Sequence, residues 1–435
     1  MKFVLSIAAI TACIALNVTP GRAAGADFTA CETMKDQAAR IRACTGLIED
    51  EQTTPDGRAK ALFNRAEAYI ATRDADRAIA DYSEIMRIDS GHYAAAFRRG
   101  IAYLNKSDND RAIADFDQAL RIKPKSGEAL INRGSAYKNK SEFDRAIVDF
   151  TDALANNTLN PAGRRFGFFN RGNALLAKGD RDRAIADFDQ AITLDPKFAS
   201  AYHVRGKAYQ AKGDLDRAIA DFDQAIAFAP KFTDAYFSRG LVYQGISDFD
   251  HAIGDYDQVI TLNPKYAVAY NNRANAYKSK GDQDRALADY NTAIAVAPQF
   301  AVAYYNRGVF YFDKGDYTKA IADYDRTIAI APQYADAYNN RGNAYVKLAD
   351  MDRALTDFTE TIALNPNHTA AYTNRADLYS KRGDFNRAIV DYDRIIELNP
   401  QLMSAYINRS AAYFKNHKFA SGVVSIVQGV MVAQK

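Results

Sequence analysis

Residues 199–232 contain two short segments in which apolar and small side chains recur at helical spacing. The first places Tyr202, Gly206 and Tyr209 at i, i+4 and i+7, and the second places Ala218, Phe222, Ala225 and Ala229 at i, i+4, i+7 and i+11. Each set falls on one face of a helix. Gly213 fits a left-handed residue after the first helix, and either Asp214 or Asp216 can cap the second. Pro230 then ends the second helix. The pattern predicts a helix–turn–helix unit.

This unit is repeated along the chain. Its marker is an arginine followed by a small residue, and eleven copies occur, at Arg65, Arg99, Arg133, Arg171, Arg205, Arg239, Arg273, Arg307, Arg341, Arg375 and Arg409. The copies follow one another at a fixed period, and only the step from Arg133 to Arg171 is longer, by four positions. A fixed period of this size is typical of stacked supersecondary units rather than one globular core. Such arrays usually bind macromolecules along an extended surface.

The repeated unit resembles the tetratricopeptide repeat family. The family pattern of aromatic, Leu-Gly, Tyr, Ala, Phe and Pro is matched here by Tyr202, Arg205-Gly206, Tyr209, Ala218, Phe222 and Pro230. The resemblance covers about residues 59–435 and departs at one position, because arginine always replaces the family's leucine. It implies an all-α, right-handed α-solenoid of about eleven 34-residue helix–turn–helix repeats. In this family the first helices line a concave surface that holds peptides or helices of partner proteins.

The first 26 residues depart from the repeat and predict a secretory signal peptide. Lys2 precedes an apolar run from Phe3 to Val18, and the small residues Ala24-Gly25-Ala26 suit cleavage before Asp27, with cleavage after Ala23 as the alternative. The run is shorter than the roughly 20 apolar residues of a membrane-spanning helix, so we expect no stable membrane insertion. Cys13 lies inside the run, which makes a lipoprotein the less favoured alternative. We therefore expect a periplasmic or secreted protein after cleavage.

Residues 27–58 are predicted to form a capping half-repeat. They hold Cys31 and Cys44, the two cysteines that remain after removal of the signal. Two cysteines in an exported chain are usually paired, so we predict a disulfide between them. No histidine lies nearby, so a metal site is not expected. The arrangement resembles exported bacterial tetratricopeptide proteins with two cysteines ahead of the array.

The remaining chain divides by the period into repeats 1–3 at residues 59–158, an insertion at 159–164, repeats 4–10 at 165–402 and a degenerate last repeat at 403–435. Asn156-Asn157 and Pro161-Ala162-Gly163 predict a long loop at the insertion. That loop is either a tolerated surface insertion or a bend between two blocks.

The second helix of the last repeat is abnormally apolar. Val424, Val427 and Met431 are predicted to lie opposite Gly422, Ile426 and Gly429. We expect those three residues to be the surface that another repeat would meet, and therefore a site of self-association or partner docking.

The composition excludes several functional classes. The chain has 56 basic and 53 acidic residues, interspersed, so it has no electrostatic footprint for nucleic acid. The five histidines have no ligand spacing, and there is no phosphate-binding loop or nucleophile motif. We expect a protein that is not an enzyme and that needs no cofactor and no metal.

Asparagine precedes the repeated arginine in eight repeats, and these residues define the asparagine ladder: Asn64, Asn132, Asn170, Asn272, Asn306, Asn340, Asn374 and Asn408. The ladder resembles that in the repeat region of O-linked N-acetylglucosamine transferases, which implies side-chain amides that hold peptide backbone. The alternative is a local bond to a neighbouring helix. The unbroken run lies in repeats 7–11, so we predict the main peptide site there.

The repeated arginine also needs a charge partner, because an isolated buried charge is costly. Ten of the eleven second helices carry an aspartate beside their aromatic residue, and only the last repeat lacks it. With eleven arginines and ten aspartates, this deficit favours pairing across repeat junctions. The predicted pairs include Arg99 with Asp81, Arg273 with Asp255, Arg307 with Asp289 and Arg409 with Asp391.

These features together predict a scaffold without enzymatic activity that binds protein or peptide ligands in the bacterial cell envelope. The alternative is a scaffold for carbohydrate or another envelope polymer, because amide and aromatic side chains also suit sugars.

Overall fold

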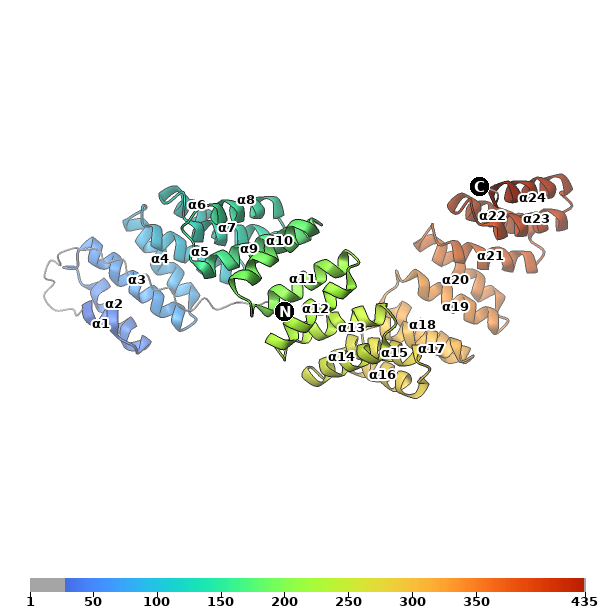
Figure 1. Ribbon diagram of the computed structural model, residues 1–435, viewed down its shortest axis with the longest axis horizontal. Coiled ribbons are helices and arrows are strands. Elements are labelled where there is room, and N and C mark those ends of the chain that lie inside the picture. The colour runs from blue at the N-terminus through green and yellow to red at the C-terminus, as the bar shows by residue number, and fades with distance from the viewer. Residues whose placement is uncertain (1–27, 434–435) are drawn as a thin grey trace. The chain divides into compact units, whose positions relative to one another are not determined.

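The computed structural model describes residues 28–433, which form 24 α-helices (Figure 1). The predicted signal peptide lies outside the described residues. Two short helices, α1 (Phe28–Thr33) and α2 (Gln37–Glu49), precede eleven helix pairs. The first helices of these pairs are α3 (Pro55–Ala71), α5 (Tyr93–Asn105), α7 (Gly127–Asn139), α9 (Pro161–Ala177), α11 (Ala199–Ala211), α13 (Thr233–Gly245), α15 (Ala267–Ser279), α17 (Ala301–Asp313), α19 (Ala335–Lys347), α21 (Thr369–Lys381) and α23 (Met403–Lys415).

The second helices are α4 (Ala75–Ile88), α6 (Asn109–Ile122), α8 (Phe143–Ala155), α10 (Arg181–Leu194), α12 (Leu215–Phe228), α14 (Phe249–Leu262), α16 (Gln283–Val296), α18 (Tyr317–Ile330), α20 (Met351–Leu364), α22 (Phe385–Leu398) and α24 (Phe419–Ala433). Each pair is one repeat, so repeat 1 is α3–α4 and repeat 11 is α23–α24. The chain divides after Pro230 into two compact units, one ending with α12 and one beginning with α13. The predicted all-α solenoid of helix–turn–helix repeats is confirmed.

The turn inside each repeat follows the predicted chemistry. Gly213 has φ of +81°, and Asp214 caps α12 by accepting a hydrogen bond from the backbone N–H of Arg217. The backbone N–H of Asp214 donates to the Tyr209 carbonyl at 3.0 Å, which closes the end of α11. In six repeats a residue other than glycine takes the left-handed conformation, for example Ser107 at φ of 63°. Asp214, rather than Asp216, is therefore the cap.

Small residues let the two helices of a repeat approach closely. Ala218 and Ala225 are fully buried, and Phe222 is fully buried against Gly206. A Cβ atom at Gly206 would lie 2.8 Å from the ring of Phe222, which is closer than real Cβ contacts. The aromatic ring therefore fills the space that the missing side chain leaves.

The first helices form a layer of their own. Within the first unit α5 contacts α7, α7 contacts α9 and α9 contacts α11, and within the second unit α15 contacts α17 and α17 contacts α19. Within each unit, the second helix of a repeat also packs on the first helix of the next repeat, as α22 does on α23. A partner that follows the first-helix layer of one unit would thus meet consecutive repeats of that unit.

The insertion at residues 159–164 is not a long loop. Pro161, Ala162 and Gly163 belong to α9, which gains an extra first turn, and Asn160 caps it by accepting from the backbone N–H of Gly163 at 2.8 Å. Proline is favoured at the first helical position, where its missing N–H would have no partner. The prediction of a loop over these residues is therefore wrong, although the four extra residues are present.

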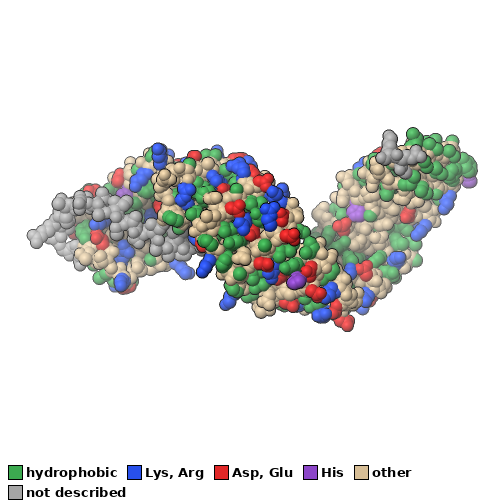
Figure 2. All heavy atoms as spheres, in the orientation of Figure 1, with side chains coloured by type: hydrophobic (Ala, Val, Ile, Leu, Met, Phe, Trp, Pro, Cys, Tyr) green, Lys and Arg blue, Asp and Glu red, His purple; other side chains and the backbone are tan. Residues whose placement is uncertain are grey.

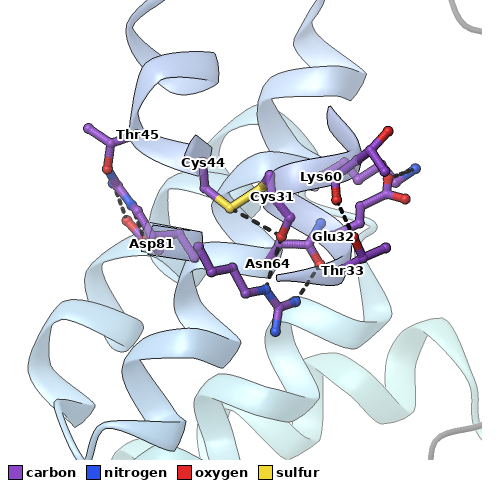
Figure 3. Close-up of a disulfide and its surroundings, with 11 residues drawn as sticks. Cys31, Glu32, Thr33, Cys44, Thr45, Lys60, Asn64 and Asp81 are labelled. Atoms are coloured by element: carbon purple, nitrogen blue, oxygen red, sulfur yellow. Dashed lines mark hydrogen bonds and ion pairs between the residues drawn. A yellow bond between two sulfur atoms is a disulfide. The ribbon is translucent and has the colours of Figure 1, made fainter. Parts of the chain in front are cut away.

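The predicted disulfide between Cys31 and Cys44 is present and joins α1 to α2 (Figure 3). Both cysteines are fully buried, with Cα atoms 4.8 Å apart. The Arg40 guanidinium donates to the Cys31 carbonyl at 2.9 Å and to Asn64 Oδ1 at 3.2 Å. The bridge and Arg40 together fasten the two short helices to α3 of repeat 1.

Across residues 28–433, none of the helices has the length and apolar character needed to cross a membrane.

Candidate functional site

The repeated arginine pairs with the aspartate of its own repeat. In α15, Arg273 donates from Nε and NH2 to both carboxylate oxygens of Asp289 in α16, each at 2.7 Å. The same two-bond geometry recurs at Arg65–Asp81, Arg99–Asp115, Arg133–Asp149, Arg171–Asp187, Arg205–Asp221, Arg239–Asp255, Arg307–Asp323, Arg341–Asp357 and Arg375–Asp391. Partners lie sixteen residues apart because the hairpin folds α16 back beside α15.

The predicted pairing across junctions is therefore wrong for these aspartates, and it fails for Arg99 with Asp81, Arg273 with Asp255, Arg307 with Asp289 and Arg409 with Asp391. In the last repeat, Arg409 donates instead to Ser425 Oγ at 3.0 Å and to Gln428 Oε1 at 2.6 Å. The neutral partners in α24 replace the missing carboxylate.

Within each unit, the third guanidinium nitrogen, NH1, does cross the junction to the preceding repeat. NH1 of Arg273 donates to Asp257 of the preceding repeat at 2.5 Å, and NH1 of Arg409 donates to Asp393 at 2.6 Å. The acceptor lies two positions after the aspartate that we predicted, and Ser83, Asn291 and Thr359 serve the same purpose for Arg99, Arg307 and Arg375. One arginine thus binds both helices of its own repeat together and also ties that repeat to its predecessor.

These pairs are structural. The ten aspartates are between 2% and 6% exposed. Burial raises the pKa of the Asp149, Asp221 and Asp357 carboxyls, while hydrogen bonds from the arginines oppose that shift. The hydrogen bonds that Arg99 donates to Asp115 raise the pKa of Arg99. A buried carboxylate held by two N–H donors has no open position for a substrate, so the pairs hold repeats together rather than perform chemistry.

The asparagine ladder makes bonds between neighbouring first helices in repeats 8–10. Asn306 Nδ2 donates to Asn271 Oδ1 at 2.9 Å, and Asn374 Nδ2 donates to Asn339 Oδ1 at 3.1 Å. Asn340 Nδ2 donates to the Tyr305 hydroxyl at 2.9 Å. In each case the acceptor lies 35 residues earlier, on the first helix of the preceding repeat. These three amides therefore bond to a neighbouring helix, which was the alternative to binding a ligand.

The other ladder members differ from one another. Asn272 accepts from Asn271, and Asn132 donates to the Glu128 carbonyl of its own helix at 2.8 Å. Asn170 is 3% exposed and accepts from Lys138, and Asn64 accepts from Arg40. Asn408 makes no side-chain hydrogen bond to any residue between 28 and 433. An amide has two N–H donors and an oxygen with two lone pairs, so one bond leaves capacity for a ligand. A ligand-binding role for the ladder stays a prediction.

Some variable first-helix positions satisfy buried tyrosines rather than a ligand. Asn275 accepts from the Tyr290 hydroxyl at 2.6 Å, and Asp377 accepts from the Tyr392 hydroxyl at 2.8 Å. We had missed this role, because a polar residue at this first-helix position also accompanies a buried phenylalanine, as Asn173 does Phe188 and Asn343 does Phe358.

A row of three lysines was also missed. Lys347, Lys381 and Lys415 hold the final position of α19, α21 and α23 in three consecutive repeats, and all three are exposed. Within the described chain none of them forms an ion pair or hydrogen bond. By contrast, Lys278 of α15 pairs with Asp313, which holds the equivalent final position of α17, at 2.6 Å. The lysine row therefore leaves positive charge along the first-helix layer of repeats 9–11.

The histidines have structural roles. Nδ1 of His92 and Nδ1 of His368 accept the backbone N–H of Ala95 and of Ala371, which caps α5 and α21. Among residues 28–433, no group of three histidine, cysteine or acidic side chains could hold a metal ion.

Helix α24 packs through its small residues. Gly422, Ser425 and Gly429 face α23, where a Cβ at Gly422 would meet the Phe414 ring and one at Gly429 would meet Met403. Ile426 is 43% exposed, so our assignment of Ile426 to the glycine side of the helix is wrong. The large apolar residues of α24 point away from α23.

Comparison with known families gives one consistent result. Family models described as TPR repeat match residues 172–213, 206–247, 274–313 and 310–348. Models described as tetratricopeptide repeat match residues 59–92, 97–164, 233–266, 255–288, 335–368 and 369–402. The matches together span residues 59–402 except 93–96 and 165–171.

Several solved structures are similar in part. MamA is 28% identical, and the match covers 37% of this chain and 94% of MamA with a TM-score of 0.35. A tetratricopeptide repeat protein from Parabacteroides merdae is 20% identical, with 60% and 98% of the two chains covered and a TM-score of 0.44. YrrB, described as a TPR protein with an unusual peptide-binding site, is 20% identical, with 45% and 97% covered and a TM-score of 0.36. No curated protein sequence matches the chain.

Proposed function

Because the chain belongs to the tetratricopeptide repeat family, whose repeats generally bind peptide or protein partners, we propose that it is a scaffold in the cell envelope that binds an acidic, extended protein segment. The segment would lie along the first-helix layer of repeats 7–11. The observation that carries this proposal is the lysine row of Lys347, Lys381 and Lys415.

The lysine row favours an acidic ligand for a reason beyond helix stability. A lysine in the last turn of any helix is stabilised by the helix dipole, by about 0.3–1 kcal/mol. That effect would act equally on all first helices, yet the equivalent position in repeats 1–8 is alanine, asparagine, glycine, serine or aspartate. Lysine at this position is therefore confined to three consecutive repeats, as one bound segment would require, whereas the lysine found one position later in repeats 2–5 and 7 is paired with an aspartate.

The neighbouring surface suits an extended chain. Val268 and Val302 lie in the first turns of α15 and α17 and are 38% and 39% exposed, which offers apolar contact between repeats. The ladder amides lie on the same helices, and each retains donor or acceptor capacity after its local bond. A peptide backbone could use that capacity irrespective of its side chains.

The cell-envelope location is supported by two features. Residues 1–26 have the layout of a secretory signal, and the chain contains a disulfide between Cys31 and Cys44. Disulfides persist mainly in oxidising compartments. Intact mass measurement on protein recovered from the periplasm of an expressing bacterium tests this, and the expected species begins at Asp27. A full-length chain confined to the cytoplasm would contradict the proposed location.

Immobilised peptides of about fifteen residues with acidic, neutral or basic composition test the ligand class. We expect acidic peptides to bind, and a triple variant Lys347→Gln, Lys381→Gln, Lys415→Gln to weaken their binding about tenfold, given about 0.2–1 kcal/mol for each exposed ion pair. The matched control replaces the exposed inter-repeat lysines Lys197, Lys231 and Lys265 by Gln and should bind normally. Equal binding of all peptides, or binding of oligosaccharides alone, would contradict the proposal.

Asn408 offers the cleanest test of the ladder, because its side chain has no hydrogen bond to lose within the described chain. If the ladder holds peptide, Asn408→Ala should weaken acidic-peptide binding and leave the free energy of unfolding unchanged. Asn306→Ala, which also removes the bond to Asn271, should cost about 0.5–1.5 kcal/mol of stability as well. Unchanged binding by the Asn408 variant would show that the ladder is purely structural.

A further inference from the structure

Helix α24 differs from every other second helix in charge. From Phe419 to Ala433 it contains no acidic or basic residue, whereas α22 contains five. In Figure 2, hydrophobic side chains gather at the end of the molecule where α24 lies. The exposed large apolar residues of this helix are Phe419, Val423, Val424, Ile426, Val427, Val430 and Met431.

One edge of α24 is the surface on which a following repeat would stack. Val423 and Ile426 hold the positions that Ile389 and Tyr392 occupy one repeat earlier, in α22. Ile389 and Tyr392 are 6% and 3% exposed, because α22 is followed by α23, whereas Val423 and Ile426 are 54% and 43% exposed. The interface that joins consecutive repeats thus continues onto α24 and is left open there.

The outer side of α24 is a second apolar surface, and stacking does not explain it. Val424, Val427 and Met431 hold the positions of Val390, Asp393 and Glu397. Val390 is 66% exposed and the side chains of Asp393 and Glu397 are 44% and 64% exposed, although a repeat follows them. Our expectation that these three residues would meet the next repeat is therefore wrong for Val424 and Met431, whereas the position of Val427 lies at the rim of the junction. The apolar surface of α24 is wider than a stacking edge.

The residue at position 427 also excludes a repeat of the internal kind as the occupant. At the equivalent position Asp393 accepts a hydrogen bond from Arg409 of the following repeat at 2.6 Å. Val427 cannot accept one. A repeat carrying the usual arginine would bury an unpaired guanidinium N–H against valine, which costs free energy.

We propose that α24 of one chain docks on α24 of a second copy. A partner that covers α24 must be apolar where it meets both surfaces, and it must lack the repeated arginine that would face Val427. It must also pack on a helix that carries no charge. A second copy of α24 meets all three conditions. An antiparallel pair would be isologous, with Ile426 and Val427, at the middle of the helix, near the two-fold axis. No charged residue of α24 would face another, because the helix has none between Phe419 and Ala433.

The dimer should dissociate on dilution. Helix α24 has 15 residues and is about 22 Å long. A pair of such helices gives an interface at the small end of the stable range, about 1,200 Å² in total. Sedimentation velocity of the full chain over a concentration series should therefore show conversion of monomer to dimer.

Substitutions test which surface is used. Ile426→Glu with Val430→Glu should give a monomer at every concentration, with the helical circular dichroism retained because both side chains are exposed. The matched control Val390→Glu, on the exposed side of α22, should dimerise like the parent chain. A parent chain that stays monomeric throughout, or a glutamate variant that still dimerises, would overturn the proposal.

A cysteine introduced into α24 tests whether the dimer contact is two-fold symmetric. With Cys13 replaced by Ser, Val427→Cys should form a disulfide-linked dimer under mild oxidation, whereas Val390→Cys should not. A dimeric parent whose Val427→Cys variant fails to cross-link would show that the contact is not isologous. Flotation of a monomeric chain with phosphatidylethanolamine–phosphatidylglycerol vesicles would overturn the proposal in favour of a lipid surface.

Discussion

Within each unit, a repeated arginine that follows another repeat is shared between the two repeats because its guanidinium presents donors in two directions. Arg273 uses Nε and NH2 for Asp289 of its own repeat and NH1 for Asp257 of the repeat before. The family's leucine at this position could only fill space. Arginine instead fixes the orientation of each hairpin relative to its predecessor through hydrogen bonds of defined geometry.

Replacing Asp289 by Ala should therefore destabilise the chain strongly. It would leave the Arg273 guanidinium half-paired, and removing one partner of a buried pair typically costs about 3–5 kcal/mol. The comparison is Asp250→Ala, whose side chain is 80% exposed and pairs with Lys280, with an expected cost of about 0–1 kcal/mol. Hydrogen exchange should show faster exchange in α15 and α16. Similar small losses in both variants would contradict a stabilising role for the pair.

One prediction about individual residues, the aspartate partner of each repeated arginine, was wrong. Counting eleven arginines against ten aspartates assumed that every arginine needs a carboxylate at the same position. Arg409 shows why the assumption fails, since Ser425, Gln428 and Asp393 together satisfy its guanidinium. Which of two aspartates faces an arginine depends on the angle between helices, and the repeat period alone does not contain that angle.

Within each helix pair, the packing depends on contact between one glycine and one ring. In repeat 9, a Cβ at Gly342 would lie 2.7 Å from the ring of Phe358, which is itself fully buried. Glycine is otherwise unfavourable in a helix, because it loses the most backbone entropy on folding. The close approach of α19 and α20 offsets that cost.

Two glycine substitutions should consequently have opposite signs. Gly342→Ala should lower the free energy of unfolding, because forcing a methyl group into a packed core costs about 1–3 kcal/mol. Gly254→Ala, in the interior of α14 with no atom within 4 Å of the added Cβ, should raise it by about 0.8–1 kcal/mol. Urea unfolding of the two variants measures both changes. The same sign in both would refute the packing argument.

Helix type, number and turn chemistry could be predicted because the same pattern occurs eleven times. The start of α9 could not. Pro161 and Gly163 read as a loop when taken as single residues, yet Asn160 caps a helix that begins at Pro161. Such a turn forms because Leu159 and Thr158 pack against Gly127 of the preceding repeat, a contact between elements that local sequence does not reveal.

Across the whole molecule, nine of the eleven second helices are capped by an aspartate. Hydrogen bonds from the residue three positions later hold the pKa of eight capping carboxyls below their usual value of 3.8, at Asp74, Asp108, Asp214, Asp248, Asp282, Asp316, Asp350 and Asp384. The ionised carboxylate is the form that stabilises the helix. Because the cap recurs in both units, the contributions of the individual caps add together.

Stability should therefore fall in acid. A carboxyl whose pKa is lower in the folded state contributes stability that is present above the unfolded pKa, near 3.8, and is lost as the pH falls through the folded pKa. Asparagine caps a helix equally well but does not titrate. Asp350→Asn with Asp384→Asn should make the decline of unfolding free energy below pH 4 shallower. An unchanged pH profile would show that other carboxyls control it.

The fold of the whole array was predictable from periodicity, but the functional surface was predictable only in part. The ladder asparagines were correctly singled out as a set, yet the bond from Asn306 to Asn271 requires knowing which first-helix residues meet between repeats. The lysine row escaped notice because each lysine is unremarkable within its own repeat. Its charge becomes visible only when repeats 9–11 are stacked.

The fixed spacing between each repeated arginine and its partners determines how such a chain can change length. In nearly all repeats the guanidinium partners lie sixteen residues before and after the arginine. Excision of residues 267–300 would place Arg307 sixteen residues after Asp257 and leave its own Asp323 in place. A gene can therefore lose or duplicate one whole repeat while every remaining repeated arginine keeps partners at the same spacing. The ends lack this freedom, because Cys31, Cys44 and the uncharged α24 each occur once, so evolution by unit duplication is confined to the interior of the array.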